Sequence, residues 1–64
     1  MAIQTENLTS LHSFLDDFKE EGLARADAVQ GAVYEVQGRL NRDGFDYEDW
    51  DEMTAAAEAR YDLQ

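Results

Sequence analysis

The sequence predicts an all-α fold, a small three-helix bundle, from the spacing of its apolar residues and the placement of its glycines. In three segments, roughly 6–21, 23–42 and 46–62, apolar residues recur at steps of three and four, the period of one face of a helix. Gly22 and Gly44 follow the first two segments, where helices commonly end on a residue with positive φ. Three amphipathic helices with short connections pack as a bundle, and a chain of 64 residues allows a single domain.

Apolar stripes define the expected inner faces of the first and third helices. The first stripe consists of Leu8, Leu11, Phe14, Leu15 and Phe18. The third consists of Tyr47, Trp50, Met53 or Thr54, Ala57 and Tyr61. This pattern places Tyr47 and Trp50 in the core, with Phe45 anchoring the chain just before the helix. The alternative is that Trp50 and Tyr47 contact a partner, since Trp and Tyr are enriched among residues that dominate binding energy. Short polar side chains can cap a helix start, so we expect Thr5 or Asn7 to cap the first helix and Asp46 the third.

The second segment contains two glycines that admit different interpretations. Its apolar stripe consists of Ala26, Val29, Val33, Val36 and Leu40. Gly31 and Gly38 lie inside it, and each weakens a helix by about 1 kcal/mol relative to alanine. Because they are seven residues apart, they share a face with Ala24 and Ala28, and a face of small residues lets another helix approach closely. A homodimer through the Gly31/Gly38 face is therefore one expectation.

A β-hairpin near 32–50 is the competing interpretation of this part of the chain. Strands near 32–40 and 45–50 would flank the turn sequence Asn-Arg-Asp-Gly. Val33, Tyr34 and Val36 have strand propensity, and the aromatic residues after the turn alternate with acids. The alternative fold is then α+β.

Charge restricts the class of partner. The chain has 15 acidic residues against 5 basic ones, a net charge of −10. Nucleic acid and anionic membranes attract the opposite sign, so we expect neither as a direct ligand. A basic protein partner fits, as does a high-salt environment. The lack of cysteine, of a long apolar run and of a signal sequence favours a soluble, cytoplasmic protein.

Several acids lie where they do not stabilise a helix. Asp16, Asp17, Glu20 and Glu21 fall in the last turns of the first helix, where the helix dipole disfavours anions. They also form two like-charge pairs four residues apart, each of which costs about 0.2–0.5 kcal/mol. This placement favours a role in binding over a role in stability.

The third predicted helix carries a second group of acids. Glu48, Asp51, Glu58 and Asp62 follow helical spacing and predict one solvent-facing stripe of carboxylates, about 21 Å long. Such a row resembles a run of phosphates. Tyr34 and Tyr61 are the expected half-exposed aromatic contacts. The candidate partner-binding residues are Asp16, Asp17, Glu20, Glu21, Tyr34, Glu48, Asp49, Asp51, Glu52, Glu58, Tyr61 and Asp62.

The sequence matches no complete motif for catalysis or metal binding. An EF-hand alignment fits Asn41, Asp43 and Gly44 to its third, fifth and sixth positions, but its first and twelfth ligands would be Arg39 and Trp50. His12 is the only histidine, and no nucleophile–base pair or phosphate-binding loop accompanies it. We therefore expect no catalytic residue, no metal site and no cofactor, and a protein that is not an enzyme.

By size, charge and helicity over its whole length, the chain resembles the small acidic proteins with which phages and mobile elements block host nucleic-acid enzymes. These include nucleic-acid mimics that inhibit restriction enzymes and many anti-CRISPR proteins. The resemblance implies a stoichiometric inhibitor that occupies a Lys/Arg-lined nucleic-acid channel, such as that of a CRISPR surveillance complex, in the host cytoplasm. It assigns no role to an individual residue. A homodimeric or adaptor module without mimicry, and a halophilic protein, are the alternative interpretations.

Overall fold

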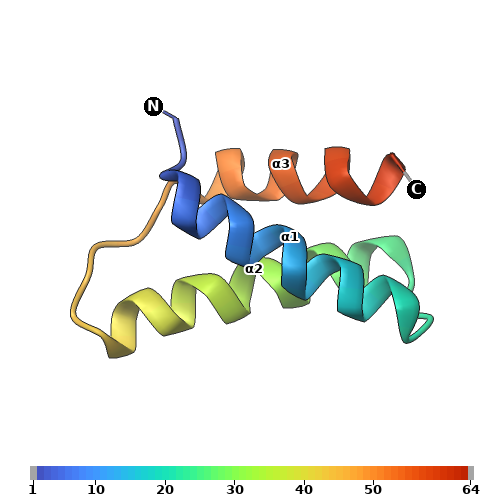
Figure 1. Ribbon diagram of the computed structural model, residues 1–64, viewed down its shortest axis with the longest axis horizontal. Helices are drawn as coiled ribbons and strands as arrows, with labels where there is room; N and C mark the ends of the chain where they lie inside the picture. The colour runs from blue at the N-terminus through green and yellow to red at the C-terminus, as the bar shows by residue number, and fades with distance from the viewer. Residues whose placement is uncertain (1, 64) are drawn as a thin grey trace.

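The computed structural model describes residues 2–63 and confirms the three-helix bundle. The helices are α1 (Thr5–Glu20), α2 (Arg25–Arg42) and α3 (Trp50–Asp62). No strand occurs among residues 2–63, so the hairpin alternative is wrong. Figure 1 shows α1 and α3 running in the same direction with α2 antiparallel to both, so that the bundle has an up-down-up course.

Glycine ends the first two helices as predicted. Gly22 has φ +92° and Gly44 has φ +81°, the left-handed region that glycine adopts without steric cost. In each case the next residue donates its N–H back across five residues, from Leu23 to Phe18 O at 3.1 Å and from Phe45 to Leu40 O at 2.8 Å. This is the Schellman arrangement, which satisfies carbonyls that the helix end leaves unpaired.

The predicted N-caps of the first and third helices are both wrong. The residue that precedes α1 is Gln4, which makes no side-chain cap, so neither Thr5 nor Asn7 is the N-cap. The third helix begins at Trp50, four residues later than predicted, and Asp49 replaces Asp46 as its cap. The Asp49 carboxylate accepts a hydrogen bond from the backbone N–H of Glu52, in the first turn of α3, at 2.9 Å.

A small core fills the space between the three helices. Its fully or nearly fully buried apolar residues are Leu11, Leu15, Ala28, Val29, Ala32, Val33, Val36, Met53 and Ala57. The predicted stripes supply most of these, but Ala26 is exposed. At Gly31 a methyl group would lie 3.2 Å from the Phe18 ring. The close approach that this glycine permits is therefore to α1 of the same chain.

The placement of Tyr47 and Trp50 in the core is wrong, and Phe45 does not anchor the chain. All three are exposed, although they belong to residue types that usually build a core. The cause is the late start of α3. Residues 45–49 form an extended linker that does not follow helical spacing, and Trp50 lies at the very edge of the helix.

Candidate protein-binding surface

Exposed aromatic side chains gather around Trp50. We call Tyr34, Tyr47 and Trp50 the aromatic surface, and their exposed fractions are 57%, 53% and 42%. The ring centroids of Tyr34 and Tyr47 each lie 5.5 Å from that of Trp50, with interplanar angles of 62° and 51°. Such tilted contacts suit the charge distribution of aromatic rings. Three separate segments thus contribute one continuous apolar patch: α2, the linker and the first turn of α3.

The linker that carries this surface is held by one buried amide. Gln37 is fully buried in α2, and its side chain pairs with the backbone of Glu48. Gln37 Nε2 donates to Glu48 O at 2.8 Å, and Glu48 N donates to Gln37 Oε1 at 3.0 Å. This reciprocal pair fixes the extended backbone two residues before Trp50.

The Glu48 side chain attaches the same linker to the start of α1. Its Oε2 accepts hydrogen bonds from Asn7 Nδ2 at 2.6 Å and from Gln4 N at 3.2 Å. Glu48 therefore lies outside α3 and is half-buried. The prediction that Glu48 begins a stripe of carboxylates on the third helix is thus wrong, because α3 begins two residues later, at Trp50.

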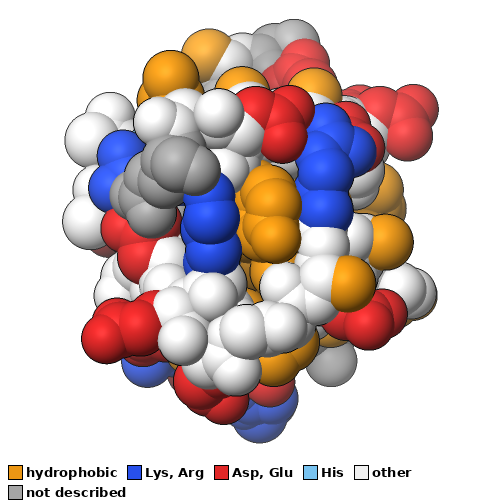
Figure 2. All heavy atoms as spheres, turned by 90° about the vertical axis from the view of Figure 1, so that its right-hand side faces the viewer, with side chains coloured by type: hydrophobic (Ala, Val, Ile, Leu, Met, Phe, Trp, Pro, Cys, Tyr) orange, Lys and Arg blue, Asp and Glu red, His pale blue; other side chains and the backbone are white. Residues whose placement is uncertain are grey.

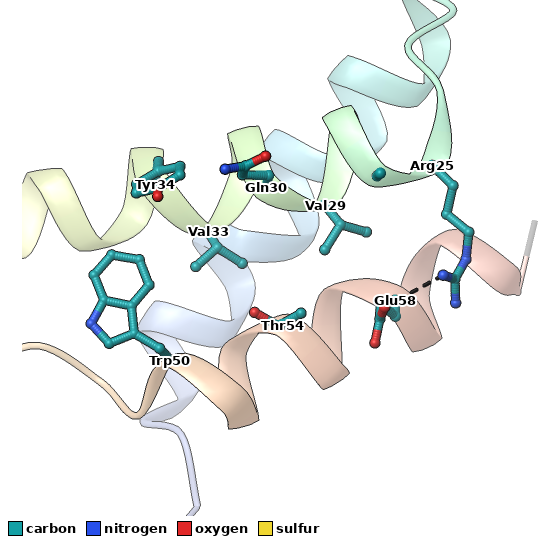
Figure 3. A pocket seen from close by; sticks show the side chains of 9 residues that line it. Arg25, Val29, Gln30, Val33, Tyr34, Trp50, Thr54 and Glu58 are labelled. Carbon is teal, nitrogen blue, oxygen red and sulfur yellow. Dashed lines mark hydrogen bonds and ion pairs between the residues drawn. The ribbon is translucent and has the colours of Figure 1, made fainter.

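A groove of about 370 Å³ runs between α2 and α3 beside the aromatic surface. Val29 and Val33 project into it from α2 and form its apolar floor (Figure 3). Trp50 and Tyr34 stand at one end. At the other end Glu58 meets Arg25 across the groove. We call this the α2/α3 groove.

Between residues 2 and 63, ion pairs engage three of the predicted partner-binding acids. Arg25 pairs with Asp62 through two hydrogen bonds of 2.9 Å, and its third nitrogen lies 3.4 Å from Glu58 Oε2. Arg60 pairs with Asp16 at 2.8 and 3.1 Å. The hydrogen bonds from Arg25 lower the pKa of Asp62, which keeps this carboxylate ionised. These three acids tie the helices together, and a partner must compete with arginine to reach them.

The tyrosine of the third helix is also engaged within the chain. Lys19 Nζ donates to the backbone oxygen of Tyr61 at 2.6 Å and lies 4.4 Å from the ring centroid. The Tyr61 hydroxyl donates to Leu23 O at 3.4 Å. Of the two tyrosines predicted as contacts, Tyr34 joins the aromatic surface and Tyr61 closes the opposite end of the bundle.

Acidic and basic side chains occur at both ends of the bundle, since Arg39 and Arg42 lie in the last turn of α2 and Arg60 lies in the last turn of α3. Where α1 and α3 end, Lys and Arg side chains lie among Asp and Glu side chains (Figure 2). Asp17, Glu20 and Glu21 are exposed there. At the other end, Asp49 and Asp51 are exposed beside Trp50, and Glu52 is half-buried. The acids of residues 16–21 and those of residues 46–52 thus lie at opposite ends of a molecule 31 Å long, as the up-down-up course requires.

Gln37 is the residue that sequence reasoning missed. It lies four residues after Val33, on the inner face of the second helix. A long polar residue at a core position is a signal, because a buried amide needs hydrogen-bond partners. The sequence did not reveal that its partner is the backbone of Glu48.

Within residues 2–63 no group of three metal-ligating side chains converges, and no helix is both long and apolar enough to cross a membrane. No protein-family model, curated protein or solved structure matches this chain. The aromatic surface with its neighbouring acids is therefore the candidate site, on the geometry alone.

Proposed function

We propose that this chain is a non-enzymatic protein-binding inhibitor whose acidic, aromatic surface enters the basic nucleic-acid-binding site of its partner. The exposure of Tyr34, Tyr47 and Trp50 as one patch carries the proposal. A domain of 64 residues has little apolar surface to bury, so leaving its only tryptophan half-exposed costs stability. Contiguous exposed apolar patches mark interaction sites, and Trp and Tyr are enriched among the residues that dominate binding energy.

The charge beside this patch supports a basic partner. Asp46 directly precedes Tyr47 in the chain and Asp51 directly follows Trp50; both are exposed, and neither forms an ion pair within the part of the chain that the structure describes. Together with the net charge of −10, they would attract a Lys/Arg-rich surface and speed association with it. Salt would weaken that attraction.

A nucleic-acid-binding site is the basic surface that we favour. Exposed acids lie at both ends of the 31 Å bundle, which supports a partner site that is itself extended, as a channel for a run of phosphates is. Acting as an anti-CRISPR protein in the host cytoplasm, by blocking DNA binding by a surveillance complex, is one form of this proposal.

Capture followed by competition tests the proposal. The immobilised chain is exposed to nuclease-treated lysate, the proteins eluted by salt are identified, and their binding to nucleic acid is measured with and without the free chain. We expect the chain to displace the nucleic acid, and the Asp46→Lys/Asp51→Lys variant to do so much more weakly. Nucleic-acid binding that is unaffected by a saturating amount of the chain would refute the inhibitor function.

The same patch supports a second candidate, a homodimer that buries the aromatic surface between two copies. Two chains of net charge −10 repel each other, so salt should strengthen this association. Sedimentation at low and high salt separates the candidates, because salt should weaken binding to a basic partner.

A further inference from the structure

We infer that the α2/α3 groove receives two arginine side chains, with an apolar residue between them, from a basic segment of the partner. This inference rests on the proposed function, since it names the part of a basic partner that the surface recognises. The groove combines three features that suit arginine: an aromatic wall, an apolar floor and a carboxylate with an open oxygen.

The aromatic wall provides a place for the guanidinium plane. Trp50 stands at one end of the groove, with Tyr34 beside it on α2 (Figure 3). Tryptophan is the best aromatic partner for a cation, and the planar guanidinium stacks on its face where a lysine ammonium cannot. The exposed carboxylates of Asp49 and Asp51 lie on the residues that flank Trp50 in the chain, which favours a cation over a neutral group.

The floor accommodates an apolar side chain or the methylene stem of the arginine. Val29 and Val33 are almost completely buried, so only a thin strip of each faces the groove. Thr54 lies between Trp50 and Glu58 along α3 and adds a hydroxyl to the lining. A basic side chain keeps its charged group in contact with polar atoms while its stem covers apolar surface.

The far end of the groove holds a carboxylate that is only partly engaged. Arg25 makes its two short hydrogen bonds to Asp62, and its contact with Glu58 is the longer one, at 3.4 Å to Oε2. Among the described residues, Glu58 Oε1 accepts no hydrogen bond. Trp50 and Glu58 are eight residues apart, about 12 Å along α3. A segment with two arginines four residues apart in an extended conformation spans a similar distance, about 13 Å.

The test uses a defined peptide, acetyl-Gly-Arg-Ser-Leu-Ser-Arg-Gly-amide, and Trp50 as an intrinsic fluorescent reporter. Trp50 is the only tryptophan of the chain, so a change in emission reports on the groove. We expect the peptide to change Trp50 emission saturably at low ionic strength. A peptide with both arginines replaced by citrulline, which has nearly the same shape without the charge, should bind at least about tenfold more weakly. Equal binding of the citrulline peptide would overturn the inference and leave the groove as a purely apolar site.

Calorimetric titration of variants separates the groove from general charge attraction. We expect Trp50→Ala to weaken binding by about tenfold and Glu58→Gln by a smaller factor. Phe45→Ala removes an exposed aromatic ring that does not line this groove, and Glu35→Gln removes an exposed acid outside it, so both variants should bind the peptide as the wild type does. Circular dichroism checks that each variant is folded.

Two results distinguish failure of the inference from failure of the proposed function. If the arginine peptide binds Trp50→Ala as tightly as the wild type, the groove does not recognise arginine, while a basic partner remains supported. If the peptide does not bind at all, the inference is wrong, and the competition experiment with nucleic acid decides the proposed function independently.

Discussion

Replacing Gln37 by methionine should loosen the linker that presents the aromatic surface. Methionine has nearly the same length and volume as glutamine, so the core remains filled. The change removes both hydrogen bonds to the Glu48 backbone, at 2.8 and 3.0 Å. At about 0.5–1.5 kcal/mol net for each bond, the loss is about 1–3 kcal/mol, reduced by the gain from burying a more apolar side chain. We expect a net loss of about 1–2 kcal/mol in the free energy of unfolding.

A loss of this size is large for so small a domain, whose total stability is about 3–10 kcal/mol at typical values per residue. Urea denaturation followed by circular dichroism measures it. The matched control is Gln30→Met, because Gln30 is an exposed glutamine of the same helix. A Gln37→Met variant within about 0.5 kcal/mol of the control would refute the reasoning that this amide holds the linker.

The substitution Gln37→Glu adds a test with a defined pH dependence. An ionised carboxyl at this buried position cannot donate to Glu48 O, so burial should raise its pKa above the ordinary glutamate value. Because this pKa is raised in the folded state, the protonated carboxyl is tolerated at low pH, and the free energy of unfolding falls as the pH rises through the raised pKa. We expect the deficit relative to the wild type to be small near pH 4 and larger at neutral pH. A deficit that does not change with pH would contradict this account.

Three further predictions concern helix ends, glycines and ion pairs. Asp49→Ala should cost about 1 kcal/mol in unfolding free energy because it removes the cap of α3, whereas Asp46→Ala should cost almost nothing; equal effects would contradict the capping assignment. Gly38→Ala should stabilise the protein by about 0.5–1 kcal/mol, since a methyl group there meets only the end of a flexible arginine. Gly31→Ala should stabilise the protein less than Gly38→Ala does, because the Phe18 ring 3.2 Å from the added methyl group must move. A larger rise in melting temperature for Gly31→Ala than for Gly38→Ala would contradict this close packing. Asp62→Asn should lower the melting temperature at neutral pH; because the folded-state pKa of Asp62 is lowered, the difference should shrink as the pH falls below the ordinary aspartate pKa, and a difference that grows in acid would count against the ion pair.

The number, type and approximate extent of the helices followed from the sequence. Apolar spacing predicted α1 and α2 to within two residues at each end, and Gly22 and Gly44 marked where those helices end. These features are local, because a helix period and a C-terminal glycine depend on residues close together in the chain. The up-down-up course of the helices also explains why the acids of residues 16–21 and 46–52 lie at opposite ends.

The tertiary structure decided what the acidic and aromatic residues do. The apolar spacing offered Met53 or Thr54 for the core, of which Met53 is buried, and it also assigned Trp50 to the core. The pairing of Gln37 with Glu48 instead holds the preceding chain extended and delays the start of α3. Likewise, helical spacing predicted Asp62 as part of a solvent-facing stripe, whereas the packing of α2 against α3 brings Arg25 into an ion pair with it. The first contact joins residues that are 11 positions apart in the sequence, and the second joins residues that are 37 positions apart. Periodicity describes only the faces of individual helices, so contacts between distant segments become visible only when the helices are packed together.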